Sequence, residues 1–585
     1  MQHNLGILVL VNASSPAYPQ GMEYVLPYLD HFGAPYTLCD LQRAPLPATL
    51  DGYSLALIAH EQIDPAGHQL DWGRLLAAVR GGLGLVAFDS MKGASPAHLA
   101  GQSAPCTLLT CAADASLIPA GATGIVFAEE HPITARHAPG ETIAFAHPVS
   151  CADGQAFLSV STLEAGRMVR WVSNEWMNTH ILGPLSGLDD VLWRSLVWAG
   201  QAAGRPFVLR GLPPLVTMRV DDVAGIGGLW GRSPLYWVKI ANRYGFKPWL
   251  GLFLYNLSQE TVAELRDLLL NGDATAFPHA FGRPPRPGAP NAQGLTYFVP
   301  GDQPLDSVLR SPVYDEFIYF DHHRACPWPD DEAARGLQAV DDWYAAHAPL
   351  PLSSYAIAHW GEMGRNTLAH VRQRWNCEFI ATYHGPDAPL LGSPWLVGGP
   401  FRSYEQPGSA LFDRAARGSR PVYYADFVNF ADQQFFLCFT EIRDETGYEW
   451  APNGDAPASA GRGLRQLRRA LDSMALPVLF THETDYIYKI SPEAWEAQLA
   501  QIAAGLAPYH PIFVTLDEGV RYVRAVKTSR LASAIYDPAA ASVAVRFAGR
   551  ADLPTHFHLF TSDLASRLVE IPPFDGEIVV EVKLG

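Results

Sequence analysis

Short apolar runs alternate with amphipathic stretches along the first 205 residues. Runs such as Gly6–Val11 and Leu83–Phe88 are rich in Val and Leu and are bounded by polar turns. Between the runs, Met22–Asp30 and Trp72–Val79 carry apolar residues at helical spacing. Strand–helix alternation of this kind predicts a doubly wound parallel sheet with helices on both faces.

The pattern changes twice further along the chain. The Pro-rich link Gly211-Leu212-Pro213-Pro214 precedes a second series of alternating strands and helices, which predicts a distorted (β/α) barrel. The C-terminal residues form short alternating runs separated by Asp, Pro and Gly, a pattern typical of a small antiparallel β-domain. The sequence therefore predicts an α/β chain of three domains, over residues 1–205, 212–528 and 530–585.

Composition narrows the class of protein. Of the 585 residues, 48% are hydrophobic and 17% are charged, which excludes a disordered chain. The net charge of −17 disfavours nucleic acid as a partner, and no apolar run is long enough to predict a membrane span. The N-terminus has no basic leader and the seven cysteines form no CxxC motif, so we expect a cytoplasmic protein with reduced thiols.

The first candidate for chemistry is the apolar run Leu215–Val223, which carries the adjacent acids Asp221 and Asp222 near its end. Two acids at the C-terminal end of a barrel strand are costly unless a metal ion or a proton is shared between them. Further on, another strand-like run ends at His279. A carboxylate and an imidazole are ligand types for zinc, cobalt or nickel. A helix cap beside a solvated carboxylate is the alternative for the aspartate pair.

From residue 215 to 525 the order of motifs resembles the polysaccharide deacetylases of the NodB-homology class (carbohydrate esterase family 4 and relatives). Asp221-Asp222 matches the first motif of that family, a strand that ends in Asp-Asp. The helix, the Gly-aromatic turn, the strand and the capped helix that follow have the order of the family. The resemblance implies that Asp221 is a general base and that Asp222 is a metal ligand.

The second motif of the family, His-x-x-x-His, is interrupted here, because His279 is followed four places later by Arg283. We interpret residues 282–320 as an insertion between two ligands, with the second histidine at His322-His323. The resemblance then implies His323 as the third metal ligand and His322 as its alternate. A polar loop with two surface histidines remains the other interpretation.

The third motif of the family, Arg-x-Pro-Tyr-Gly, falls where this chain has His359-Trp360-Gly361-Glu362. Only the glycine matches in type, and the arginine that orients the base is absent. We expect His359 or Glu362 to replace that arginine if the site is active.

The fifth motif of the family is a strand that ends in Leu-His, with a helix and a strand behind it. Here Leu476–Phe480 leads into Thr481-His482-Glu483, and a Ser-Pro-Glu helix start follows. The resemblance therefore implies that His482 is the general acid.

The resemblance implies a metal-dependent hydrolase that removes acetyl groups from an N- or O-acetylated carbohydrate or glycoconjugate. A metal-activated water attacks the carbonyl, Asp221 accepts its proton and His482 protonates the leaving group. Zinc is the expected metal, with cobalt or nickel as alternatives. A non-catalytic carbohydrate-binding or scaffolding protein on the same fold, and hydrolysis of another C–N amide, remain as alternative functions.

The N-terminal domain resembles the class I glutamine-amidotransferase-like and flavodoxin-like domains in its order of strands and helices. An active amidotransferase carries a cysteine at a sharp strand-to-helix turn. Here the run Leu83–Phe88 continues into Asp89-Ser90-Met91-Lys92 without a cysteine. We therefore expect this domain to be non-catalytic.

Overall fold

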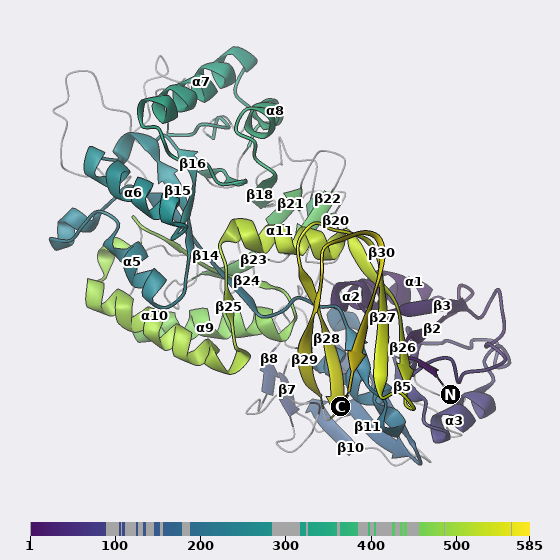
Figure 1. The fold of residues 1–585 in the computed structure, drawn as a ribbon. Coiled ribbons are helices and arrows are strands. Elements are labelled where there is room, and N and C mark those ends of the chain that lie inside the picture. The colour runs from purple at the N-terminus through teal and green to yellow at the C-terminus, as the bar shows by residue number, and fades with distance from the viewer. Residues whose placement is uncertain are drawn as a thin grey trace. The chain divides into compact units, whose positions relative to one another are not determined.

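The computed structural model divides the chain into two compact units (Figure 1). Unit 1 comprises Met1–Pro213, Asp472–Met474 and Arg524–Gly585, and unit 2 comprises Pro214–Leu471 and Ala475–Val523. The structure describes residues 2–88, 156–172, 174–177, 188–282, 316–322, 324, 326–359, 363–383, 456–484, 486–562 and 564–584, together with Leu117 and short strands within 104–151 and 396–441.

Unit 1 contains a nine-stranded mixed sheet. In spatial order its strands are β3 (Tyr36–Asp40), β2 (Ile7–Val11), β4 (Leu55–Ile58), β5 (Gly84–Ala87), β12 (Gly166–Trp171), β11 (Ala156–Leu163), β10 (Ala146–Cys151), β7 (Leu108–Cys111) and β8 (Gly124–Val126). The strands from β3 to β12 run parallel and the others run antiparallel. The five parallel strands agree with the predicted doubly wound parallel sheet, whereas the four antiparallel strands β11, β10, β7 and β8 were not predicted. The turn Glu164-Ala165 between β11 and β12 is too short for the crossover that a parallel pair requires.

The helices of unit 1 follow the parallel strands. They are α1 (Tyr18–Gln20), a π-helix (Gly21–Val25), α2 (Leu26–Phe32), α3 (Trp72–Arg80), α4 (Asp189–Gly200) and the 3₁₀ turns Glu175–Met177 and Ala202–Gly204. Helix α3 confirms the helical spacing in the sequence. Its N-cap Asp71 accepts a hydrogen bond of 2.9 Å from the backbone N–H of Arg74. Leu75 and Val79 of α3 are fully buried in the core of the sheet.

The C-terminal strands are antiparallel, as the alternating runs predict. One sheet has the order β1 (His3–Asn4), β26 (Ser529–Asp537), β27 (Ser542–Ala551) and β30 (Phe574–Lys583), and the other has β13 (Phe207–Leu209), β28 (Thr555–Ser562) and β29 (Ala565–Ile571). Strands β1 and β13 belong to the N-terminal part of the chain and pair with the edges of β26 and β28. The C-terminal strands consequently share a core with N-terminal residues such as Leu5 and Val208.

Unit 2 is built on a parallel sheet. Its strands, in spatial order, are β16 (Thr275–Ala280), β15 (Pro248–Phe253), β14 (Leu215–Val223), β24 (Leu476–His482) and β23 (Cys438–Glu441), with β25 (Ile512–Phe513) paired to the start of β14. All of these pairs are parallel. Every residue of β14, β15 and β24 is buried, which explains why these strands are continuous apolar runs in the sequence.

The series of strands continues beyond β16. Strand β17 (Tyr355–Ile357) lies beside β16, where the Ser353 N–H donates to the Ala276 carbonyl at 2.8 Å. β17 pairs in parallel with β18 (Phe379–Tyr383), and β21 (Tyr424–Phe427) and β22 (Gln433–Phe436) add antiparallel pairs. The strand pairs form no closed ring among the described residues, so the distorted barrel remains a prediction.

Helices alternate with the strands of unit 2. They are α5 (Tyr236–Arg243), α6 (Gln259–Asn271), α7 (Asp330–Ala346), α8 (Arg365–Gln373), α9 (Ala456–Asp472), α10 (Pro492–Leu506) and α11 (Leu516–Lys527). The described residues of unit 2 also form the 3₁₀ turns Gly227–Trp230, Leu254–Asn256, Ile487–Lys489 and Ala507–Tyr509 and the strand pair β19 (Leu396–Val397) with β20 (Ser403–Tyr404). In unit 1, β6 (Ala104–Cys106) pairs with β9 (Ile133–Ala135). None of the helices in the described part of the chain is both long and apolar enough to cross a membrane.

The ends of α6 show how the sequence sets element boundaries. The Ser258 hydroxyl accepts a hydrogen bond of 3.1 Å from the Thr261 N–H at the N-terminus of the helix. Gly272 ends the helix in the left-handed conformation, with φ of 74°. Both signals are legible in the sequence, and they fix the length of the connection from β15 to β16.

Candidate metal centre

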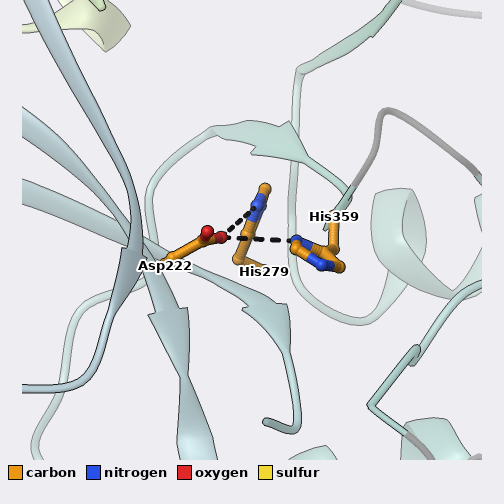
Figure 2. Close-up of side chains that lie close together, drawn as sticks. All are labelled: Asp222, His279 and His359. Atoms are coloured by element: carbon orange, nitrogen blue, oxygen red, sulfur yellow. Dashed lines mark ion pairs between the residues drawn. The ribbon is translucent and has the colours of Figure 1, made fainter. Parts of the chain in front are cut away.

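Three side chains of unit 2 form a group that could hold a metal ion. Asp222, His279 and His359 each offer one ligand atom, and these atoms all lie within 4.8 Å of one another. They come from the C-terminal ends of β14 and β16 and from the residues just after β17. Figure 2 shows a ring nitrogen of each histidine directed toward the carboxylate of Asp222. The side chains are buried, with relative exposures of 4%, 1% and 7%, so the group is shielded from bulk water.

The backbone of β14 explains how two adjacent aspartates reach the same place. Neighbouring residues of a regular strand point to opposite faces of the sheet. Asp222 has a left-handed conformation, with φ of 58°, and the register of β14 against β15 shifts between Val220 and Val223. Oxygens of both Asp221 and Asp222 consequently lie 3.5 Å from His279 Nε2. The irregularity therefore brings both carboxylates to one site.

His279 is oriented by the neighbouring strand. Its Nδ1 lies 2.8 Å from the Ile357 carbonyl of β17, so Nδ1 can donate there and Nε2, which faces Asp222, is the nitrogen available to a metal ion. The close approach of β15 also holds the ring. A Cβ added to Gly251 would lie 3.0 Å from His279 Cγ, so the glycine makes room for the imidazole.

His359 lies between two carboxylates. Its Nδ1 is 3.3 Å from Asp222 Oδ1, and its Nε2 is 3.0 Å from Oε1 of the buried Glu316. Its ring meets the ring of His279 edge to face, with centroids 5.0 Å apart. Burial lowers the pKa of His359, but the two carboxylates outweigh burial and raise this pKa to about 10. The surroundings of His359 thus favour positive charge.

The residues fit a divalent metal ion. Asp222 Oδ1 is buried and has no partner in hydrogen-bond geometry among the described residues. Burial opposes ionisation of Asp222, yet contact with His279 and His359 holds its pKa well below the ordinary value, so the ligand is an anion. One carboxylate and two imidazoles form a ligand set suited to zinc, cobalt or nickel.

Arg219 holds Asp221 in place. Its Nε donates to Asp221 Oδ1 at 2.7 Å and its Nη2 donates to Oδ2, and both side chains are buried. The guanidinium carbon lies 4.2 Å from the centroid of the Phe480 ring. Burial would raise the pKa of Asp221, but Arg219 and His279 outweigh burial and lower it. Asp221 is therefore an ionised carboxylate in a fixed orientation.

Arg219 takes the place of the arginine that is absent from the third motif, because it orients Asp221. The sequence suggested His359 or Glu362 as the residue that orients Asp221, but the contact of Asp221 in the structure is with Arg219, and His359 lies against Asp222. Arg219 stands two residues before Asp221 on β14. Because residues i and i+2 of a strand share a face, this pairing was legible in the sequence.

His482 lies beside Asp221. The parallel register of β14 and β24 pairs these two residues directly, and His482 is buried. Its ring contacts that of Phe480, with centroids 4.8 Å apart. The structure thus places the expected acid and the expected base on neighbouring strands at the same edge of the sheet.

Glu483 binds the loop that follows the two aspartates. Its carboxylate accepts hydrogen bonds from three successive N–H groups, those of Ala224, Gly225 and Ile226, and from Trp237 Nε1 at 2.6 Å. Burial raises the pKa of Glu483 to about 7, and the four donors act against this rise. No sequence motif pointed to this role, which fixes the backbone directly after Asp222.

Of the two other histidines expected as ligands, His322 and His323, the structure describes only His322. His322 stacks on Phe317 with ring centroids 4.6 Å apart and is absent from the cluster of Asp222, His279 and His359. His323 and Glu362 lie outside the described residues. Glu316, which the sequence analysis did not single out, reaches the site because the Phe281 N–H, just beyond β16, donates to the Glu316 carbonyl at 2.8 Å.

Comparisons with known proteins leave the family open. No family model and no curated protein matches the chain. Among solved structures, a beta-galactosidase from Rahnella sp. R3 is 12% identical over 29% of this chain and 29% of that chain, with a TM-score of 0.20. A cytoplasmic protein from Salmonella typhimurium is 11% identical over 33% of this chain and 99% of that chain, with a TM-score of 0.24. An exo-beta-1,4-mannosidase from Opitutaceae bacterium strain TAV5 is 12% identical over 34% of this chain and 36% of that chain, with a TM-score of 0.22. The chain covers about a third of the length of the two glycosidases. At these TM-scores the likenesses carry no argument about activity.

The close approach at Gly251 gives a first prediction. Replacing Gly251 with Ala places a methyl group 3.0 Å from His279 Cγ, so the ring has to shift relative to Asp222. We expect the dissociation constant for Zn²⁺ or Co²⁺, measured by competition titration, to rise by about tenfold or more. Gly228→Ala is the matched control, because its Cβ meets no described atom within 4 Å. Equal affinity of the two variants would contradict the assignment of His279 as a ligand.

The four hydrogen bonds that Glu483 accepts, here called the Glu483 clamp, give a second prediction. In Glu483→Gln an amide N–H₂ replaces one oxygen and faces two N–H donors, which lose their acceptor. We expect the free energy of unfolding to fall by about 2–4 kcal/mol, measured by denaturant unfolding with tryptophan fluorescence. Glu496→Gln is the control, because Glu496 is partly exposed and pairs with Arg243 near the surface. A similar small change in both variants would show that the clamp contributes little.

Proposed function

We propose that unit 2 is the catalytic unit of a metal-dependent hydrolase that cleaves an amide or ester bond, with an acetylated carbohydrate as substrate. One observation carries the proposal. A buried ligand group of Asp222, His279 and His359 lies against Asp221, an ionised carboxylate that is fixed by Arg219 and is not itself in the ligand group. A structural metal site has no need of an oriented carboxylate beside its ligands, whereas hydrolysis requires a base at that position.

The metal ion would supply a Lewis acid that polarises the carbonyl and lowers the pKa of a coordinated water. Asp221 would accept the proton on Oδ2, the oxygen that lies 3.5 Å from His279 Nε2 and therefore faces the ligand group. The two hydrogen bonds from Arg219 fix the direction of this carboxylate and prevent it from rotating toward the metal position. The folded protein thus orients the base before substrate binds, so substrate binding does not have to restrict its rotation.

His482 would donate a proton to the leaving amine or alcohol. Its place opposite Asp221 in the register of β14 and β24 puts a second proton-transfer group at the same strand ends. A base and an acid on neighbouring strands suit the two proton transfers of amide hydrolysis, one from the attacking water and one to the leaving group.

The substrate class rests on the order of the sequence motifs. A strand that ends in Asp-Asp, a later strand that ends in a histidine and a final strand that ends in His482 follow the order of the polysaccharide deacetylases. An N-acetyl or O-acetyl group on a sugar is accordingly the proposed target, and zinc, cobalt or nickel is the proposed metal.

The proposal predicts separate effects for the two aspartates. Asp221→Asn removes the proton acceptor and retains the ligands, so we expect metal content to persist and kcat to fall by about 10²–10⁴-fold. Asp222→Ala removes a ligand, so we expect both metal and activity to be lost. The measurement is acetate release from acetylated chitooligosaccharides and from acetylated xylan, with elemental analysis of the same samples.

Asp341→Asn serves as the control for this pair, because Asp341 is a carboxylate of unit 2 that contacts His370 and Arg374 away from the ligand group. Full activity of Asp221→Asn would contradict the assignment of Asp221 as the general base. Metal-loaded wild-type protein that binds these glycans and releases no acetate would favour the non-catalytic, carbohydrate-binding function instead.

A further inference from the structure

Glu316 has no part in the proposed proton transfers, although it lies at the metal centre. It is buried, and its Oε1 is 3.0 Å from Nε2 of His359, on the side of the ring opposite the nitrogen that faces Asp222. Its backbone is fixed by the hydrogen bond of 2.8 Å from the Phe281 N–H. Three residues on, the Tyr319 hydroxyl donates to the Pro278 carbonyl at 2.6 Å. The segment that carries Glu316 is thus attached to β16, the strand that carries His279.

We propose that Glu316 is a positioning residue for the metal centre, which holds His359 as an Nδ1 ligand and balances the charge of a divalent ion. The inference rests on the metal site of the proposed function and adds a residue to it. A histidine binds a metal through an unprotonated nitrogen, so the other nitrogen must carry the proton. With Nδ1 directed at Asp222, the proton belongs on Nε2, which lies 3.0 Å from the carboxylate oxygen Oε1 of Glu316.

The two histidines are held by different kinds of acceptor. His279 Nδ1 faces the neutral carbonyl of Ile357, whereas His359 Nε2 faces the carboxylate of Glu316. A carboxylate behind a metal-bound imidazole fixes the ring and makes its free nitrogen a stronger donor to the metal. Loss of such a partner typically weakens metal binding by about 10–100-fold. His359 is thereby the imidazole ligand that is backed by a charged group.

The charges at the metal centre also indicate that Glu316 helps to balance a divalent ion. Arg219 and Asp221 form an ion pair and cancel, and Asp222 and Glu316 are the two further carboxylates that contact the histidines. When a metal ion takes the place of the proton on His359, both imidazoles are neutral and two negative charges remain, in a place shielded from water. A divalent ion balances these charges, and removal of Glu316 would leave the ion with one uncompensated positive charge.

Competition titration of Zn²⁺ and of Co²⁺ into chelator-treated full-length protein tests this role. Glu316→Gln, which is nearly isosteric, should raise the dissociation constant by about 10–100-fold relative to the wild type. Glu316→Ala, which also removes the acceptor of the ring proton, should bind at least as weakly as Glu316→Gln. Glu316→Asp, which keeps the charge on a shorter side chain, should recover part of the affinity. Circular dichroism of each variant before the titration establishes that it is folded.

Asp341→Asn is the matched control, because Asp341 Oδ2 lies 3.4 Å from His370 Nε2 in the same unit, outside the ligand group. Its affinity for metal should equal that of the wild type. Equal affinity of Glu316→Gln and the wild type would overturn the role of Glu316 and leave the metal centre standing. Absence of metal binding in the wild type would overturn the metal centre itself and the role of Glu316 with it.

Discussion

Asp222 has a left-handed backbone conformation at the end of β14, with φ of 58°. This conformation costs about 1–3 kcal/mol for a residue with a side chain, so the surrounding structure has to hold it. Glu483 does so by binding the backbone N–H groups of Ala224, Gly225 and Ile226, and the Glu483 N–H donates in turn to the Asp221 carbonyl at 3.0 Å. Without this turn, Asp221 and Asp222 would point to opposite faces of the sheet. The ligand and the base can share a site because the backbone is strained at this point.

The carboxylates of the site differ in what they contact. Asp221 is neutralised by Arg219, which keeps it ionised and oriented, whereas Asp222 contacts only imidazoles among the described residues and therefore has charge available for a cation. Glu316 places a further negative charge behind His359. A buried cluster of this composition needs positive charge, from a proton on His359 or from a metal ion, and its ligand types suit a metal ion.

Much of this arrangement was predictable from the sequence, and the reasons for the failures are physical. Strands β14 and β24 are continuous apolar runs because they are buried on both faces, and Asp222 and His279 were recognisable because each lies near the end of such a run. His359 was singled out by its position after a strand, but its role depends on how β17 packs against β16, which motif order does not encode. Glu316 depends on a backbone contact with Phe281 across residues 283–315, and no local pattern specifies that contact. The antiparallel half of the sheet in unit 1 was missed because short strands and turns there were read as part of a βα alternation.

Asp222, His279 and His359 are the proposed ligands of a divalent metal ion. The most direct test is elemental analysis of purified wild-type protein beside His359→Ala and His322→Ala, after incubation with zinc and removal of the excess. We expect one zinc ion per chain in the wild type and in His322→Ala, because His322 stacks on Phe317 outside the ligand group. We expect loss of the ion in His359→Ala. Full zinc content in His359→Ala, or loss of zinc in His322→Ala alone, would contradict the ligand set.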